Sequence, residues 1–252
     1  MLNQVQFTYK RSAEFLASAS INQYGKFKIL HEITPAFEWH GILQDFATTY
    51  FGHFLNFDAN TLFSSKLVHS LLTKEIVVDG VGDFELYFGV GGRRLRFSKY
   101  EFCLLTGLKF GEWAHFSAYN NSIVECGVLQ RYWLNGKIDV ISLQNRLCEQ
   151  GTRFKHREDP LKIALVLFVE RFLLGADYRK TVSPWLFTLV EDMEQFNSFP
   201  WENLSFKWLF IIWIMPVVLL NLERIRCDGI FMAFPLYCRL VTNLYLAYLV
   251  TW

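Results

Sequence analysis

The feature that most restricts the fold of this chain is a change of hydrophobic period at residues 84–97, which read FELYFGVGGRRLRF. Apolar side chains alternate with Glu85 and Tyr87 before Gly91-Gly92 and with Arg94 and Arg96 after it. This is the pattern of two half-buried strands. A tight hairpin turn needs two residues with positive φ, and glycine adopts this conformation without a steric penalty. The segment therefore predicts one β-hairpin.

A short helix is predicted directly after the hairpin. Residues 98–101 read SKYE, a capping box in which the Ser98 hydroxyl and the Glu101 carboxylate each bind a backbone N–H at the start of a helix. Gly107 suits the left-handed position that commonly ends a helix. Strand, turn, strand and helix thus form one compact unit of about 25 residues.

Helical spacing dominates the rest of the chain. Hydrophobic residues make up 52% and charged residues 19%, and 25 of the 252 residues are Phe, whose bulky rings favour a large, irregular helical core. The clearest helix starts at Asp159-Pro160, with Asp159 as the cap and Pro160 in the first turn, and extends to Gly175. Because residues 164–174 are apolar nearly all round, this helix should be central. The predicted helices are 35–52, which Pro35 opens, 61–73, 129–133, 141–149, 159–175 and 183–200.

These elements predict a mainly α fold, an irregular helical bundle with one β-hairpin (residues 84–97) packed on it. The length suits one domain with additions rather than two domains. The predicted divisions are a weakly ordered N-terminal segment, 1–34, a helical domain, 35–206, and apolar C-terminal helices, 207–252.

The C-terminal region leaves three interpretations open. Residues 208–222 are apolar but too few to span a membrane, and Pro216 interrupts them, whereas 229–252 are numerous enough but include Arg239. A pair of core helices, an aberrant or truncated gene end, and a membrane anchor each fit this pattern.

Composition argues against several classes of site. A formal net charge of +1 gives no long-range field that would attract nucleic acid or an anionic membrane. Five cysteines without a C-x-x-C pair indicate buried thiols in a reducing compartment, nuclear or cytoplasmic, rather than zinc ligands. The N-terminus lacks the apolar run of a signal peptide. We expect no cofactor, no metal and no small-molecule substrate.

No catalytic constellation is recognisable. The glycines at 89–92 join two strands and do not open a helix, so they do not fit a dinucleotide-binding loop. Cys126 has no patterned histidine that could act as its base. The residues left as interaction candidates are Arg93, Arg94 and Arg96 on the second hairpin strand, where nearby carboxylates also fit an ordinary solvated face.

Three stretches together are similar to one known family: residues 51–76, 84–112 and 159–206, with weaker similarity at 131–147 and 229–241. The most specific piece is RFSKYEFCLLTGL, residues 96–108. The chain resembles the plant domain-of-unknown-function family numbered nineteen eighty-five. The resemblance implies the N-terminal part of a plant, transposon-related protein, which in some members precedes a ubiquitin-like-protein-specific cysteine protease domain.

The family has no established catalytic residues, so none carries over to this chain. The resemblance and the hairpin arginines together suggest a non-catalytic module that binds protein or nucleic acid. Two alternatives stay open: a fragment of a longer cysteine protease that lacks its catalytic domain, and a fragment anchored in a membrane through residues 208–252.

Overall fold

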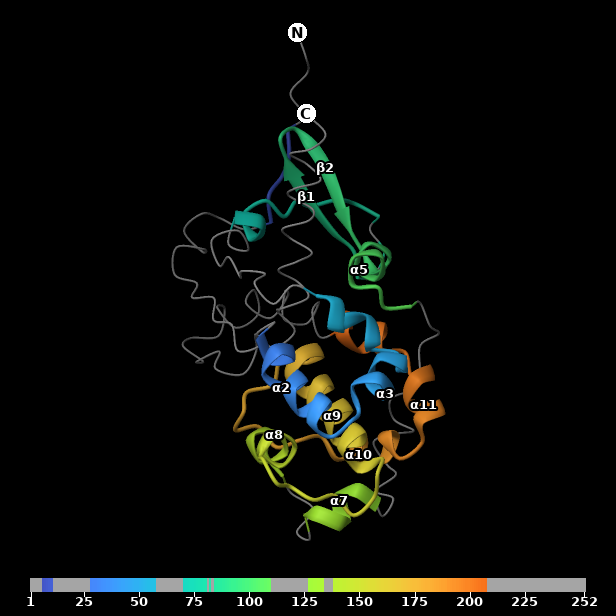
Figure 1. Ribbon diagram of the computed structural model, residues 1–252. Helices are drawn as coiled ribbons and strands as arrows, with labels where there is room; N and C mark the ends of the chain where they lie inside the picture. Colours follow the sequence, from blue (N-terminus) through green and yellow to red (C-terminus); the bar gives the residue numbers. More distant parts are fainter. Residues whose placement is uncertain are drawn as a thin grey trace. The chain divides into compact units, whose positions relative to one another are not determined.

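A computed structural model describes residues 6–10, 28–57, 70–80, 82, 84–109, 127–133 and 138–207 (Figure 1). Within them the fold is mainly helical with one antiparallel hairpin, as predicted. The chain divides into two compact units. We call Met1–Gln23, Leu62–Phe110 and Glu202–Trp252 the hairpin unit, and Tyr24–Thr61 and Gly111–Trp201 the helical unit.

The predicted hairpin is confirmed in the hairpin unit. Strands β1 (Leu86–Val90) and β2 (Arg93–Phe97) pair antiparallel, with Val90 opposite Arg93 at the turn. Gly91 and Gly92, the two residues of the turn, have φ values of 55° and 74°, the left-handed conformation that favours a tight two-residue hairpin turn. The turn therefore forms where local chemistry predicts it.

The capped helix after the hairpin is also confirmed. Helix α5 (Lys99–Thr106) starts at Ser98, whose backbone N–H donates to the Glu101 carboxylate at 2.7 Å, while the Ser98 hydroxyl accepts from the Tyr100 N–H at 3.2 Å. Gly107, at φ 75°, ends the helix. Both ends of α5 are thus fixed by local signals.

Two further segments extend the pairing beyond β1. Glu75 bridges Phe88 of β1, and Tyr9 bridges Ile76 in turn. The Gly89 N–H donates to the Lys74 carbonyl at 2.8 Å. Of the predicted helix 61–73, residues 61–69 lie outside the described part of the chain, and 70–72 are helical. The two-stranded sheet is thus extended by single bridges to two further segments, and only the hairpin was predicted.

Aromatic side chains form the core of the hairpin unit. Residues 202–207 are helical and place Phe206 against Phe102 of α5 and Phe97 of β2, with ring centroids 5.4 and 6.1 Å apart. All three rings are buried. The inner face of the hairpin is thus covered by residues more than 100 positions further along the chain.

The helical unit is built around one buried helix, as predicted (Figure 1). Helix α9 (Asp159–Phe168) has no solvent-exposed side chain from Ile163 onward, and it continues as the π-helical segment η2 (Val169–Leu173) up to Gly175, at φ 60°. The elements that pack on α9 are α2 (Lys28–Trp39), α3 (Leu43–Thr48), α7 (Gly127–Tyr132), α8 (Val140–Cys148) and α10 (Pro184–Val190).

Phe168 is the centre of an aromatic cluster in this core. The centroid of its ring lies 4.7 Å from that of Phe51 and 5.5 Å from that of Phe54. Phe51 directly precedes the 3-10 helix η1 (Gly52–Asn56), and Phe54 lies within it. Phe46 and Phe172 complete the contacts at 5.7 and 4.8 Å. All five rings are at most 2% exposed, so the high Phe content serves the core as predicted.

The predicted helix 35–52 is wrong in its bounds. Pro35 lies inside α2, which is already helical at Lys28, and Gly41, at φ 66°, separates α2 from α3. Thr34 donates its hydroxyl to the Leu30 carbonyl at 2.6 Å, one residue before the site where proline removes a backbone donor. Gly52 is the first residue of η1, and a Cβ there would lie 1.9 Å from the Ala47 carbonyl oxygen, so the close approach requires glycine.

The predicted helix 183–200 is two helices. After α10, Asp192 accepts hydrogen bonds from the N–H groups of Glu194 and Gln195, both at 3.0 Å, and so starts helix α11 (Met193–Ser198). An aspartate in the middle of an apolar pattern acts here as a new cap. The predicted helices 129–133 and 141–149 are confirmed as α7 and α8, within two residues at each end.

No helix among the described residues reaches the length and hydrophobicity needed to cross a membrane. The apolar stretches 208–222 and 229–252, on which that alternative depends, lie outside the described part of the chain. The predicted segment boundaries at residues 34 and 206 stay predictions.

Candidate interaction surface on the hairpin

The three predicted arginines all lie exposed on β2, but they differ in their partners. Arg96 forms ion pairs with Glu101 at 2.9 Å and Glu85 at 3.9 Å. The hydrogen bond to Glu101 raises the pKa of Arg96. Within the described ranges, neither Arg93 nor Arg94 lies within ion-pair distance of a carboxylate. The charge of Arg96 is therefore neutralised by carboxylates, whereas those of Arg93 and Arg94 are not paired with a carboxylate of the described residues.

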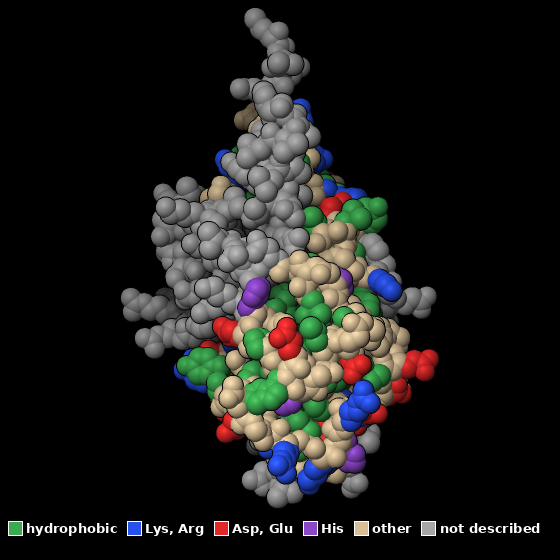
Figure 2. Space-filling model, viewed as in Figure 1, with side chains coloured by type: hydrophobic (Ala, Val, Ile, Leu, Met, Phe, Trp, Pro, Cys, Tyr) green, Lys and Arg blue, Asp and Glu red, His purple; other side chains and the backbone are tan. Residues whose placement is uncertain are grey.

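Basic side chains are visible around the hairpin of the hairpin unit (Figure 2). Gly89 of β1 lies opposite Arg94 on one side and opposite Lys74 on the other, as its hydrogen bond to the Lys74 carbonyl shows. Residues directly opposite in an antiparallel sheet point to the same face, so Lys74 and Arg94 share one face with Gly89 between them. Lys74 is exposed and, among the described residues, has no ion pair.

Aromatic rings lie on the same face. A Cβ on Gly89 would be 2.6 Å from Cδ2 of Phe7, so the Phe7 ring rests directly on the glycine. Tyr9 is 44% exposed, and the Lys74 ammonium lies 5.7 Å from the centre of its ring. We call Phe7, Tyr9, Lys74 and Arg94 the aromatic–basic face. It combines cations with rings that water reaches.

Sequence reasoning found only one residue of this face, Arg94. Residues 6–10 read QFTYK, in which Phe7 and Tyr9 alternate with polar residues, and this period of two could have predicted a strand. Gly89 was grouped with the turn glycines. Its role is to admit the Phe7 ring, a common reason for glycine inside a strand.

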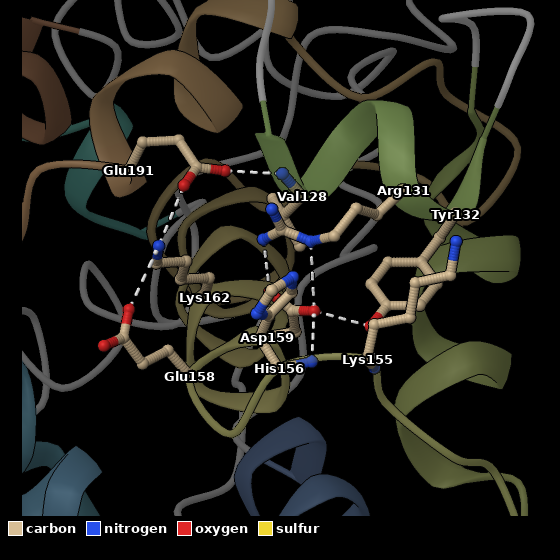
Figure 3. Close-up of polar contacts among 9 residues, drawn as sticks. All are labelled: Val128, Arg131, Tyr132, Lys155, His156, Glu158, Asp159, Lys162 and Glu191. Carbon is tan, nitrogen blue, oxygen red and sulfur yellow. Dashed lines mark hydrogen bonds and ion pairs between the residues drawn. The ribbon is translucent and has the colours of Figure 1, made fainter.

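A second polar cluster lies buried in the helical unit, around Asp159 (Figure 3). Asp159 is fully buried and accepts hydrogen bonds from Nε of Arg131 at 3.1 Å, the Tyr132 hydroxyl at 2.5 Å and the His156 N–H at 3.2 Å. A second Arg131 nitrogen, Nη2, contacts the other carboxylate oxygen. Asp159 is thus the first residue of α9 and binds α7, instead of capping its own helix as predicted.

Glu191 makes the second half of this cluster. Its carboxylate accepts from the Val128 N–H at 2.5 Å, in the first turn of α7, and from Nζ of Lys162 at 2.8 Å (Figure 3). Lys162 also lies 3.4 Å from Glu158. Each oxygen of Asp159 and Glu191 therefore has a donor within the protein. Such saturated carboxylates hold α7 against α9, and we assign the cluster a structural role.

The Asp159 cluster predicts a specific loss of stability in acid. Burial alone would raise the pKa of Asp159, but the hydrogen bonds from Tyr132 and Arg131 lower it below its usual range. A carboxyl whose pKa is lower in the folded state stabilises the protein fully above its unfolded pKa of about 3.9 and loses this contribution as the pH falls through the folded pKa. Urea unfolding at pH 2–6 should therefore show a steeper fall below about pH 4 in the natural chain than in Asp159→Asn. Equal slopes would contradict this origin.

The two cysteines among the described residues, Cys103 and Cys148, form no disulfide. Cys103 is buried in the hairpin unit, and burial, together with the nearby Glu202 carboxylate, raises its pKa to about 12. Burial also raises the pKa of Cys148. Cys126, which invited the protease comparison, lies outside the described residues, as do Cys227 and Cys238. In the described part of the chain, no group of histidines, cysteines and carboxylates could hold a metal ion.

Comparison with known proteins identifies the family. No curated protein and no solved structure matches the chain. The family model described as "Domain of unknown function (DUF1985)" matches residues 72–211, more than half of the 252 residues. This stretch contains Lys74, both hairpin strands and α7 to α11, whereas Phe7 and Tyr9 precede it. The chain belongs to the DUF1985 family, as the resemblance of its hairpin and central helix implied.

Proposed function

We propose that this chain is a non-catalytic interaction module that binds an anionic partner through the end of its hairpin. The observation that carries the proposal is the contrast on β2: carboxylates neutralise Arg96, whereas Arg93 and Arg94 beside the turn have none within ion-pair distance in the described ranges. Guanidinium groups presented in this way suit carboxylates and phosphates, which they bind in a forked geometry.

The packing of the hairpin on its neighbouring residues supports this role. Two glycines allow the left-handed turn, and α5 follows the second strand after a single capping residue. Sites on well-defined elements present their side chains more reproducibly than sites on loops. The inner face is buried on Phe102 and Phe206, so the arginines project from a packed scaffold.

The proposal extends to the context that the family resemblance implies. We place the module in a plant, transposon-related protein of the nucleus or cytoplasm, where an interaction domain would bring a partner to the rest of the protein. A cysteine protease domain beyond this chain is compatible with the same role. Among the described residues, the buried Cys103 and the half-buried Cys148 form no disulfide, which supports a reducing compartment.

We expect the variant Arg93→Ala/Arg94→Ala to bind polyanions roughly tenfold more weakly, since two exposed ion pairs contribute up to about 1 kcal/mol each. Fluorescence anisotropy with labelled heparin, polyglutamate and oligonucleotides at several salt concentrations measures this loss. For a single-stranded oligonucleotide, the slope of log affinity against log salt should also decrease by about 1.4.

The matched control removes two cations from the helical unit. Lys155 and Arg157 are exposed, and in the described structure neither side chain has an ion pair. Lys155→Ala/Arg157→Ala should retain the natural affinity. An equal loss in both double variants, or no polyanion binding at micromolar protein, would refute the proposed function.

A further inference from the structure

We infer that the partner is single-stranded nucleic acid, with bases stacked on the aromatic–basic face and phosphates held by its cations. The inference rests on the proposed function and deepens it, because it concerns the same end of the hairpin. It draws on a second observation, the aromatic rings that lie beside the cations.

The two cations of this face are separated by an aromatic ring. Lys74 and Arg94 lie on either side of Gly89 in one row across the sheet. Two strand spacings separate their backbones by roughly 10 Å. The Phe7 ring fills the space above Gly89, between the two. A chain of phosphates that crosses the strands would therefore meet a cation, an aromatic ring and a second cation in order.

Tyr9 presents a second ring on this face. This residue is 44% exposed, and the centroid of its ring lies 6.4 Å from that of Phe7 in an edge-to-face arrangement. The Lys74 ammonium lies 5.7 Å from the Tyr9 centroid. A base stacked on Tyr9 would bring its own phosphate close to Lys74. Tyr9 would then bind the base and Lys74 the phosphate of the same nucleotide. Exposed rings interleaved with cations on a sheet are the usual platform for unpaired bases.

Three classes of anion differ in what they offer this face. An acidic peptide would use the cations and leave the rings without a partner. Duplex DNA presents phosphates but keeps the faces of its bases stacked inside the helix. Only a single strand offers negative charge and free π faces together. The observations therefore favour single-stranded nucleic acid over both alternatives.

The test uses the full chain and four probes: an oligo-dT of about 20 nucleotides, an abasic strand of equal length, the matched duplex and polyglutamate. Stacking of one base contributes about 1–3 kcal/mol, so we expect Tyr9→Leu to weaken oligo-dT binding at least about fivefold. Binding of the abasic strand and of polyglutamate should change less than about twofold. Tyr9→Phe, which keeps the ring, should restore oligo-dT binding.

The chain offers a matched control in the helical unit. Tyr178 is 49% exposed and carries a cation over its ring, Arg179, at 5.2 Å from the ring centroid. Tyr178→Leu should leave all four affinities unchanged. Thermal unfolding of each variant checks that the fold persists.

The outcomes distinguish the inference from the proposed function. Should Tyr9→Leu bind oligo-dT as the natural chain does, or should polyglutamate or the duplex bind as tightly as oligo-dT, the stacking inference is wrong. Polyanion binding that still depends on Arg93 and Arg94 would then leave the proposed function intact. Loss of that dependence would overturn both.

Discussion

Replacing Asp159 with alanine lowers the free energy of unfolding by about 3–5 kcal/mol, the cost of breaking a buried ion pair by removing one partner. Asp159 is fully buried and accepts hydrogen bonds from Arg131, Tyr132 and the His156 N–H. The substitution leaves these donors without their acceptor at the contact between α7 and α9. Because 23% of the Arg131 side chain is exposed and can turn toward water, we expect the lower half of this range.

Urea unfolding followed by far-ultraviolet circular dichroism measures this effect. The matched control is Asp177→Ala, since Asp177 pairs with Arg179 at 3.1 Å but 72% of the Arg179 side chain is exposed. Ion pairs of this kind contribute at most about 1 kcal/mol. Similar losses in the two variants would show that burial of the Asp159 cluster does not strengthen it.

Replacing Phe168 with alanine, as a separate variant, should lower the free energy of unfolding by about 3–5 kcal/mol, because it removes a fully buried ring from the centre of the helical unit. The ring contacts Phe46, Phe51, Phe54 and Phe172, so its loss opens a cavity among side chains that cannot all move inward. Phe168→Leu fills more of that space and should cost less.

The control for this core substitution lies on α5 of the hairpin unit. Leu104 is 68% exposed, and surface substitutions usually change stability by no more than about 0.5 kcal/mol. Leu104→Ala should therefore unfold close to the natural chain in the same urea titration. A Phe168→Ala variant as stable as Leu104→Ala would mean that the aromatic cluster does not stabilise the core.

Sequence reasoning succeeded where the signal is local. The turn glycines at 91 and 92, the Ser98 cap and the apolar run after Pro160 each specify an element through neighbouring residues, and all three appear as predicted. It failed where context decides. Pro35 was placed at a helix start, although residues 28–34 already form about two turns of helix before it.

The polar contacts could not be predicted for the same reason. Asp159 carries a strong cap signal, yet its carboxylate binds Arg131, which lies 28 positions away, and the choice depends on how α7 packs. The aromatic–basic face likewise unites residues 7–9, 74 and 94 through sheet pairing that no local pattern specifies. A single sequence identifies the segments but not their neighbours.

Each of the two units is assembled from separate stretches of the chain, and this restricts how the gene can be rearranged. The backbone leaves the hairpin unit after Phe110, completes the helical unit and returns at Glu202. Neither unit corresponds to one continuous stretch of coding sequence, so recombination that moved one of them alone would leave both incomplete. The family match, which runs without interruption from residue 72 to 211, covers parts of both units. Gene rearrangements that preserve this fold must therefore transfer both units together.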